Sequence, residues 1–290
     1  MAEKPDVKAL VETMPDLDSR KDKKGKVHTT GKLTGPKWPD AEKVYEAILD
    51  GGREAVAAVV DLLEPIDDGR DYKARYVLAG LAAFVCRDGR EKHRAVYDEA
   101  LASRLGGDRP KPVRAFLLRQ LQTAGDKSAV AAAGKLLLDE DLCEPAAQAL
   151  VAIDPKAAGE ALRRALPRAD GPRRLTIVQG LGVVADAASA RALREALGDA
   201  DREVRIAAGW SLARLGEDGS VEALMKAADA KDRWERIQAA RACLLLAEKL
   251  RAAGKGTEAA RLYKHLRDTR RDESERYLRE AAERALAPST

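Results

Sequence analysis

The chain has 290 residues, and its 52 basic and 48 acidic side chains give a formal net charge of +4. With 45% hydrophobic and 34% charged residues, the composition is globular and excludes wholesale disorder. No apolar run approaches the roughly 18–20 residues that a membrane span needs. The sequence holds 55 Ala and 35 Leu but only 2 Phe and 3 Trp, a ratio that favours helices over sheets.

Residues 1–40 differ from the rest of the chain. They show no helical stripe of apolar side chains, and residues 17–40 are rich in Lys, Gly and Pro. This pattern predicts an extended or partly disordered N-terminal arm, whose end Trp38 could fix on the following helices. Charges are scattered from Met1 to Arg20, unlike a secretory signal. The sequence therefore indicates a cytoplasmic protein, unless a signal peptide has been removed.

From residue 41 onward, apolar residues recur with helical spacing, interrupted by short Gly-, Pro- or Asp-containing turns. Val204, Ala208, Leu212 and Leu215, for example, form one stripe on a helix. The predicted helix pairs are 41–49 with 53–64, 72–86 with 91–105, 110–124 with 127–138, 142–152 with 156–166, 172–185 with 187–197, 202–215 with 219–229, and 233–250 with 257–267. A last helix over 273–286 is expected to cap the end.

The helix pairs are internal repeats. Sliding the chain along itself by one repeat aligns Arg174, Arg205 and Arg236 in one column, and Leu181, Leu212 and Cys243 in another. A two-helix unit cannot bury both of its faces alone, so neighbouring units must stack to form a continuous core. The sequence predicts an all-α fold in which residues 41–290 form an α-solenoid of about seven stacked antiparallel helix pairs.

Residues 201–229 resemble a HEAT repeat of the short bacterial kind, called HEAT-like or phycobilisome-lyase-type. Asp201, Val204–Arg205, Ala208, Leu212 and the Val221–Leu224 pair carry the resemblance. It extends over 169–246, with a looser match over 110–168. The resemblance implies a HEAT-like superhelix and, for most such proteins, a scaffold role, because the repeated residues build the core. Some similar proteins attach bilins, and others are DNA glycosylases.

An arginine column is the most regular polar feature of the repeats. Its members are Arg75, Arg114, Arg174, Arg205 and Arg236. All except Arg114 follow an Asp by four residues, and an Asp there can cap the helix or pair with the Arg one turn on. Because the same pairing recurs in repeat after repeat, we interpret the column as a structural link between repeats.

Two sets of residues are candidates for partner binding. Trp210 occupies a column that is polar in other repeats, and Trp234 takes a place held elsewhere by Pro or Glu, so both rings are expected to reach the surface, where Trp is enriched at hot spots. The second set is an outward column on the second helices, Lys135, Arg164, Glu195, Lys226 and Lys264, which is basic at four of five positions. On a concave face it would suit an acidic, extended segment of a protein partner.

The sequence shows no catalytic motif. The three His are isolated, the three Cys lie far apart as reduced, buried thiols, and no phosphate loop or metal-ligand spacing is present. We therefore expect a non-enzymatic scaffold without cofactor or metal that binds a protein on its concave face.

Two alternatives to the scaffold remain open. One is a nucleic-acid-binding or DNA-repair protein resembling HEAT-like alkylpurine DNA glycosylases. Those proteins use aromatic residues in the concave groove, and the second helices from 127 to 229 have none. The other is a bilin lyase-like role, which rests on the repeat type alone. The sequence leaves the oligomeric state undetermined and argues against nucleic acid or a membrane as the partner.

Overall fold

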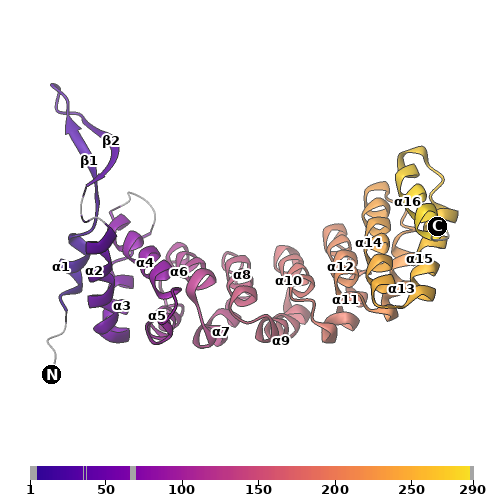
Figure 1. Cartoon of the computed structure of the whole chain (residues 1–290), viewed down its shortest axis with the longest axis horizontal. Coiled ribbons are helices and arrows are strands. Elements are labelled where there is room, and N and C mark those ends of the chain that lie inside the picture. The colour runs from indigo at the N-terminus through magenta and orange to yellow at the C-terminus, as the bar shows by residue number, and fades with distance from the viewer. Residues whose placement is uncertain (1–4, 35, 37, 66–69, 288–290) are drawn as a thin grey trace. The chain divides into compact units, whose positions relative to one another are not determined.

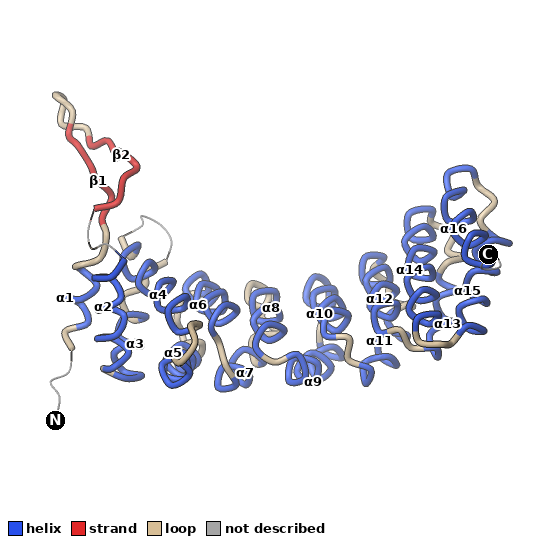
Figure 2. Tube along the Cα trace, viewed as in Figure 1, coloured by secondary structure: helices blue, strands red, loops and turns tan. Residues whose placement is uncertain are grey.

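The computed structural model describes residues 5–34, 36, 38–65 and 70–287. It is built of helices and one β-hairpin (Figures 1 and 2). The chain divides into two compact units, Met1–Asp154 and Pro155–Thr290.

The first unit contains α1 to α8 and both strands. In chain order these are α1 (Val7–Glu12), β1 (Asp16–Lys21), β2 (Val27–Thr34), α2 (Trp38–Asp50), α3 (Gly52–Val60), α4 (Tyr72–Val85), α5 (Glu91–Ser103), α6 (Lys111–Ala124), α7 (Lys127–Gly134) and α8 (Cys143–Ile153).

The second unit contains α9 to α16 and four short 3₁₀ turns. In chain order these are α9 (Pro155–Ala165), η1 (Leu166–Arg168), α10 (Gly171–Val184), η2 (Ala187–Ser189), α11 (Ala190–Ala196), α12 (Arg202–Leu215), η3 (Asp218–Ser220), α13 (Val221–Ala227), α14 (Arg233–Ala252), α15 (Gly256–Thr269), η4 (Glu273–Glu275) and α16 (Arg276–Leu286).

In each unit the helices stack in two layers, as the sequence predicts for an α-solenoid. We call the even-numbered helices α2 to α14 the first helices and the odd-numbered helices α3 to α15 the second helices. In the second unit, α10 packs on α12 and α12 on α14, while α13 packs on α15 (Figure 1). The first unit repeats this order, with α4 against α6 and α3 against α5.

Capping residues explain where the helices of the second unit begin and end. Asp201 accepts a hydrogen bond from the backbone N–H of Glu203 at the start of α12 (2.8 Å), and Asp232 accepts one from Glu235 at the start of α14 (2.8 Å). Gly216 ends α12 with a φ of 73°, a left-handed conformation that glycine adopts without strain. These helix boundaries therefore follow from local sequence and do not depend on tertiary packing.

The core lies between the layers. Leu181, Leu212 and Cys243, which share a column of the repeat, are completely buried, and so are Leu193 and Leu224 of the second helices. This confirms the predicted register of the second unit. In α7 of the first unit, Ala129 and Ala133 are completely buried and Val130 is partly buried. The α-helix there ends at Gly134 rather than continuing to residue 138.

One contact in the second unit is close enough to require glycine. A Cβ built on Gly182 of α10 would lie 2.9 Å from the Cα of Ser211 on α12, a distance that real Cβ atoms do not show. The Ser211 hydroxyl also donates to the carbonyl of Val178 across the same pair of helices (3.0 Å). The first helices of the second unit therefore approach each other nearly backbone to backbone at this point.

Residues 5–34 contain regular structure that the sequence analysis did not anticipate. Asp6 caps α1 by accepting a hydrogen bond from the backbone of Ala9 (3.0 Å), and Val11 and Met14 are buried where α1 meets α3 and α4. The helix is too short to show an apolar stripe. The strands β1 and β2 then pair antiparallel, with Lys21 opposite Val27. The side chain of Trp38, predicted to fix the end of this segment, lies outside the described side chains.

We expect α1 to stabilise the first unit and the hairpin to contribute little. Met14 is only 2% exposed, so Met14→Ala should lower the free energy of unfolding by about 1–2 kcal/mol. The loss should not be larger, because α1 can detach locally while the rest of the unit stays folded. Replacing residues 16–34 by a short Gly-Ser linker should change it by less than about 0.5 kcal/mol, because the described side chains of the hairpin are exposed. Urea titration measures both. A larger loss from the hairpin replacement than from Met14→Ala would contradict this assignment.

Candidate functional site: arginine links and a partner-binding surface

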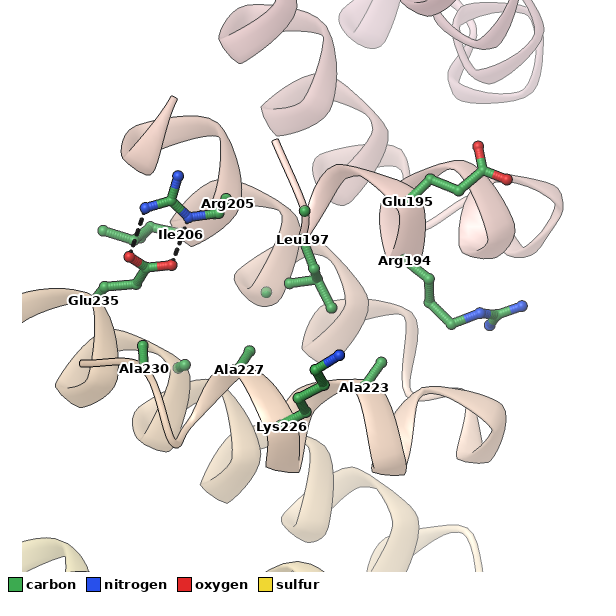
Figure 3. Close-up of a pocket in the computed structure, with 13 residues that line it drawn as sticks. Arg194, Glu195, Leu197, Arg205, Ile206, Ala223, Lys226, Ala227, Ala230 and Glu235 are labelled. Carbon is green, nitrogen blue, oxygen red and sulfur yellow. Dashed lines mark hydrogen bonds and ion pairs between the residues drawn. The ribbon is translucent and has the colours of Figure 1, made fainter. Parts of the chain in front are cut away.

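Arg205 joins two successive repeats of the second unit. Its guanidinium donates two hydrogen bonds to Glu235 of α14, at 2.6 and 2.7 Å (Figure 3). The same side chain donates to the carbonyls of Asp199 (2.8 Å) and Ala200 (3.0 Å) in the loop before its own helix. The bond to Glu235 raises the pKa of Arg205 above its usual value. A bidentate guanidinium–carboxylate pair is among the stronger polar contacts in proteins.

Two other members of the arginine column in the second unit are placed in the same way. Arg174 donates to Asp199 (2.5 Å) and to the carbonyl of Leu166 (3.2 Å). Arg236 donates to Glu275 (2.8 Å), which is itself buried, and to loop carbonyls. Each arginine therefore binds the loop before its own helix and a carboxylate that follows later in the chain.

The arginines of the column in the first unit behave differently. Arg75 pairs with Asp71 (2.7 Å), donates to the carbonyl of Glu64 (2.8 Å) and lies 4.8 Å over the ring of Phe116 on the next first helix. The Nε of Arg114 is buried without a hydrogen-bond partner among the described residues. Four arginines of the column follow an Asp by four residues, and among the described residues Arg75 alone pairs with that Asp.

The sequence analysis missed a second set of arginine links, on the second helices. Arg163 of α9 pairs with Asp186, and Arg194 of α11 pairs with Glu217 (2.6 Å). Both carboxylates lie in the turn between the two helices of the next repeat. The signal was present, because one repeat separates Arg163 from Arg194 and also separates Asp186 from Glu217.

A pocket of about 480 Å³ lies where α11, α12, α13 and α14 meet (Figure 3). The ion pair between Arg205 and Glu235 forms one side, and Arg194 and Lys226 line the other. Glu195 also lines the pocket, and the remaining lining is apolar, with Leu197 and Ile206 as its largest members. Three cations and two carboxylates therefore surround the apolar part of the pocket.

All four basic residues of the predicted column are exposed: Lys135, Arg164, Lys226 and Lys264. None of them makes an ion pair or a side-chain hydrogen bond within the part of the chain that the structure describes. Glu195, the acidic member, accepts a hydrogen bond from Arg191 (3.0 Å). Lys135 follows α7 instead of lying within it, and it belongs to the first unit while the other three belong to the second.

The two tryptophans differ in exposure. Trp234 of α14 is 52% exposed. Trp210 of α12 is half-buried, and its indole N–H donates to Gln238 of α14 (3.3 Å). Trp234, Gln238 and Arg241 are spaced i, i+4 and i+7 and so share one side of α14. Arg241 in turn donates to the hydroxyl of Tyr277 on α16 (3.1 Å).

In the second unit, the large exposed apolar side chains lie on first helices and on α16. Val183 (59% exposed), Trp234 and Tyr277 (44%) are the large ones there, and no second helix in the described residues carries any. Next to Val183, a groove of about 400 Å³ runs between α10 and α12, lined by Leu175, Ile206 and Trp210 among others. We call the surface formed by Trp210, Trp234, Arg241 and Tyr277 the aromatic face.

The three cysteines differ in burial. Burial raises the pKa of the Cys243 thiol to about 12, which keeps it protonated. Cys143 is buried too, whereas Cys86 is exposed, contrary to the expectation that all three are buried. Among the described residues, no group of three or more His, Cys, Asp or Glu side chains is placed to hold a metal ion. None of the described helices combines the length and the apolarity needed to cross a membrane.

Comparison with known proteins identifies the repeats. Residues 168–244 match the family model described as HEAT repeats. No curated protein matches the chain. Three solved structures can be compared with it. An engineered protein is 24% identical, with a TM-score of 0.46, over 84% of this chain and 70% of its own.

The other two structures are complexes. The complex of CpcE and CpcF of phycocyanin lyase from Nostoc sp. PCC7120 is 18% identical, with a TM-score of 0.42, over 81% of this chain and 94% of the matched one. Kap121p bound to Nup53p is 13% identical, with a TM-score of 0.49, over 98% of this chain and 36% of the matched one. Residues 168–244 therefore resemble HEAT repeats, and the helix pairs of each unit stack as in an α-solenoid.

Proposed function

We propose that this chain is a non-enzymatic scaffold that binds a protein partner through the aromatic face of its second unit. The observation that carries the proposal is the grouping of Trp210, exposed Trp234 and exposed Tyr277 on the successive helices α12, α14 and α16, where Gln238 and Arg241 bridge them. Trp, Tyr and Arg are the residues most enriched at binding hot spots, and all three types occur on this face. The basic column is a second candidate surface, suited to an acidic, extended segment.

The proposal is tested by comparing variants for binding to one partner. A partner captured from extracts of the source organism would be produced in pure form, and its affinity measured by calorimetry. Trp234→Ser with Tyr277→Ser should lower the affinity by about tenfold or more, because each truncation of a hot-spot aromatic costs more than about 1 kcal/mol. Circular dichroism would verify that the variant is folded.

The matched comparison is the triple charge reversal Lys135→Glu, Arg164→Glu and Lys226→Glu. These side chains are exposed, so the variant should fold. If the aromatic face binds the partner, this variant should keep most of its affinity. Loss of binding in the charge variant alone would instead assign the partner to the basic column, and wild-type affinity in both variants would contradict both surfaces.

A further inference from the structure

The tip of the β-hairpin concentrates positive charge. Residues 20–26 contain five cations, Arg20, Lys21, Lys23, Lys24 and Lys26, and one acid, Asp22. All of these side chains are exposed. We call the five cations the basic tip. Figure 2 shows that the hairpin projects away from the helices of its own unit.

The only acid in this segment is used to form the turn. The Asp22 carboxylate accepts hydrogen bonds from the backbone N–H groups of Lys24 (2.8 Å) and Lys26 (2.9 Å), and its other oxygen lies 3.0 Å from the His28 ring. Gly25 takes a left-handed φ of 79°, and its N–H donates to the carbonyl of Asp22 (3.0 Å). The turn is thus specified by Asp22 and Gly25, and the lysines are not required to form it.

The five cations of the basic tip carry charge that the fold does not use. None of them forms an ion pair or a side-chain hydrogen bond with any residue that the structure describes. In the second unit, by contrast, arginines are paired within the fold, as Arg174, Arg205 and Arg236 are. A net charge of +4 over seven exposed residues therefore faces solvent uncompensated.

The residue types at the tip indicate the class of ligand. Lysine is depleted in protein–protein interfaces, which rely on aromatic and apolar anchors, whereas Lys and Arg supply most contacts to nucleic-acid phosphates. Val27 is the only large apolar residue beside the tip, and the tip has no aromatic residue to anchor a protein or enter a membrane. The composition therefore fits phosphates better than a protein surface or a lipid bilayer.

The shape of the hairpin agrees with a duplex. Two paired strands are about 5 Å apart, and the major groove of B-form DNA, about 12 Å wide, admits a two-stranded ribbon. Arg20 is opposite His28 and Lys21 opposite Val27 in the antiparallel pair. Successive side chains of a strand point to opposite faces, so Arg20 and Lys21 place positive charge on both faces of the ribbon.

We propose that the β-hairpin binds double-stranded DNA, with the basic tip contacting phosphates on both sides of the major groove. Binding would be largely independent of sequence, because phosphate contacts position a protein without reading bases. The proposal is independent of the aromatic face, which lies in the other unit. Together the two would make the chain an adaptor between DNA and a protein.

The test is fluorescence anisotropy of a labelled 24-base-pair random-sequence duplex, titrated with the full chain at 50 to 200 mM KCl. Three to four phosphate contacts predict a slope of about −3 to −4 for log affinity against log salt, or roughly a hundredfold weaker binding at the higher salt. The quadruple variant Lys21→Gln, Lys23→Gln, Lys24→Gln and Lys26→Gln keeps Asp22 and Gly25. It should reduce affinity at 50 mM KCl at least tenfold and flatten the slope.

The matched control removes the same charge outside the hairpin and outside the basic column, as Lys92→Gln, Lys127→Gln, Lys231→Gln and Lys249→Gln, all of them exposed. It should bind within about threefold of the wild type, because screened charges outside the contact contribute little. The proposal is overturned if the two variants lose affinity equally, or if the tip variant binds as the wild type does. It is also overturned if poly-glutamate or phosphatidylserine vesicles bind the tip more tightly than the duplex. Replacing residues 16–34 by the Gly-Ser linker should abolish duplex binding in the same way.

Discussion

Leu212→Ala is expected to lower the free energy of unfolding by about 2–5 kcal/mol. Leu212 is completely buried on α12, which packs between α10 and α14. Its removal forfeits the transfer energy of the side chain and leaves a cavity, because helices on both sides hold the backbone in place. In a repeat stack each interface stabilises its neighbours, so the whole second unit should become less stable. Denaturant titration followed by circular dichroism measures the effect.

Gln179→Ala is the control for this prediction. Gln179 lies on α10, two residues before Leu181, and its side chain is exposed. The expected change is within about 0.5 kcal/mol. Arg241 shares its column but is a poorer control, because it donates to Tyr277 and stacks on that ring (5.6 Å). Equal losses of unfolding free energy in Leu212→Ala and Gln179→Ala would show that the buried and exposed columns are wrongly assigned.

Arg205→Ala is expected to lower stability by about 2–3 kcal/mol. The substitution removes two bonds to Glu235 and two to loop carbonyls, and hydrogen bonds to charged groups contribute about 1.5–3 kcal/mol where they are partly shielded from water. Both side chains are less than a quarter exposed, so Glu235 would remain as a poorly solvated carboxylate. Adding Glu235→Ala should therefore recover part of the loss, which a double-mutant cycle would quantify.

The control on the same helix is Arg202→Ala. Arg202 pairs with Glu203, and both side chains are about half exposed, so this pair should contribute less than about 1 kcal/mol. If Arg205 acts only as a link between repeats, the folded fraction of Arg205→Ala should keep its affinity for a partner. Reduced affinity with unchanged stability would instead assign Arg205 to the neighbouring pocket.

Much of the fold could be predicted from the sequence because the repeat carries its own core pattern. Leu181, Leu212 and Cys243 recur at a fixed spacing, and the helix boundaries follow caps such as Asp201 and Gly216. A cap involves residues within one turn of helix, and the repeat spacing is visible within a single sequence, so both could be recognised before the structure was known. The helix α1 was missed because it has six residues, of which Val11 alone is buried, too few to make a periodic stripe.

The contacts of the candidate sites were harder to predict because they depend on the register between repeats. The acceptor of Arg205 is Glu235, inside the next first helix, whereas Arg174 uses Asp199, in the loop before the next first helix. No fixed spacing specifies both. The aromatic face depends on how α14 and α16 rotate against each other, which decides whether Tyr277 meets Arg241. The hairpin turn, by contrast, could have been predicted from Asp22 and Gly25. It was overlooked because the surrounding residues are rich in lysine.

The direction of the arginine links has a consequence for dividing the chain into fragments. Arg174, Arg205 and Arg236 all bind carboxylates that follow them in the sequence, and the last acceptor, Glu275, lies in the short η4 turn before α16. A fragment that stops after α15 would leave Arg236 as a cation without its carboxylate. A fragment of the second unit that begins at a later repeat keeps each remaining arginine of the column matched with its acceptor. The segment from η4 onward thus supplies the carboxylate that pairs with the last arginine of the column. Shortened versions of this unit should therefore be trimmed from the N-terminal side.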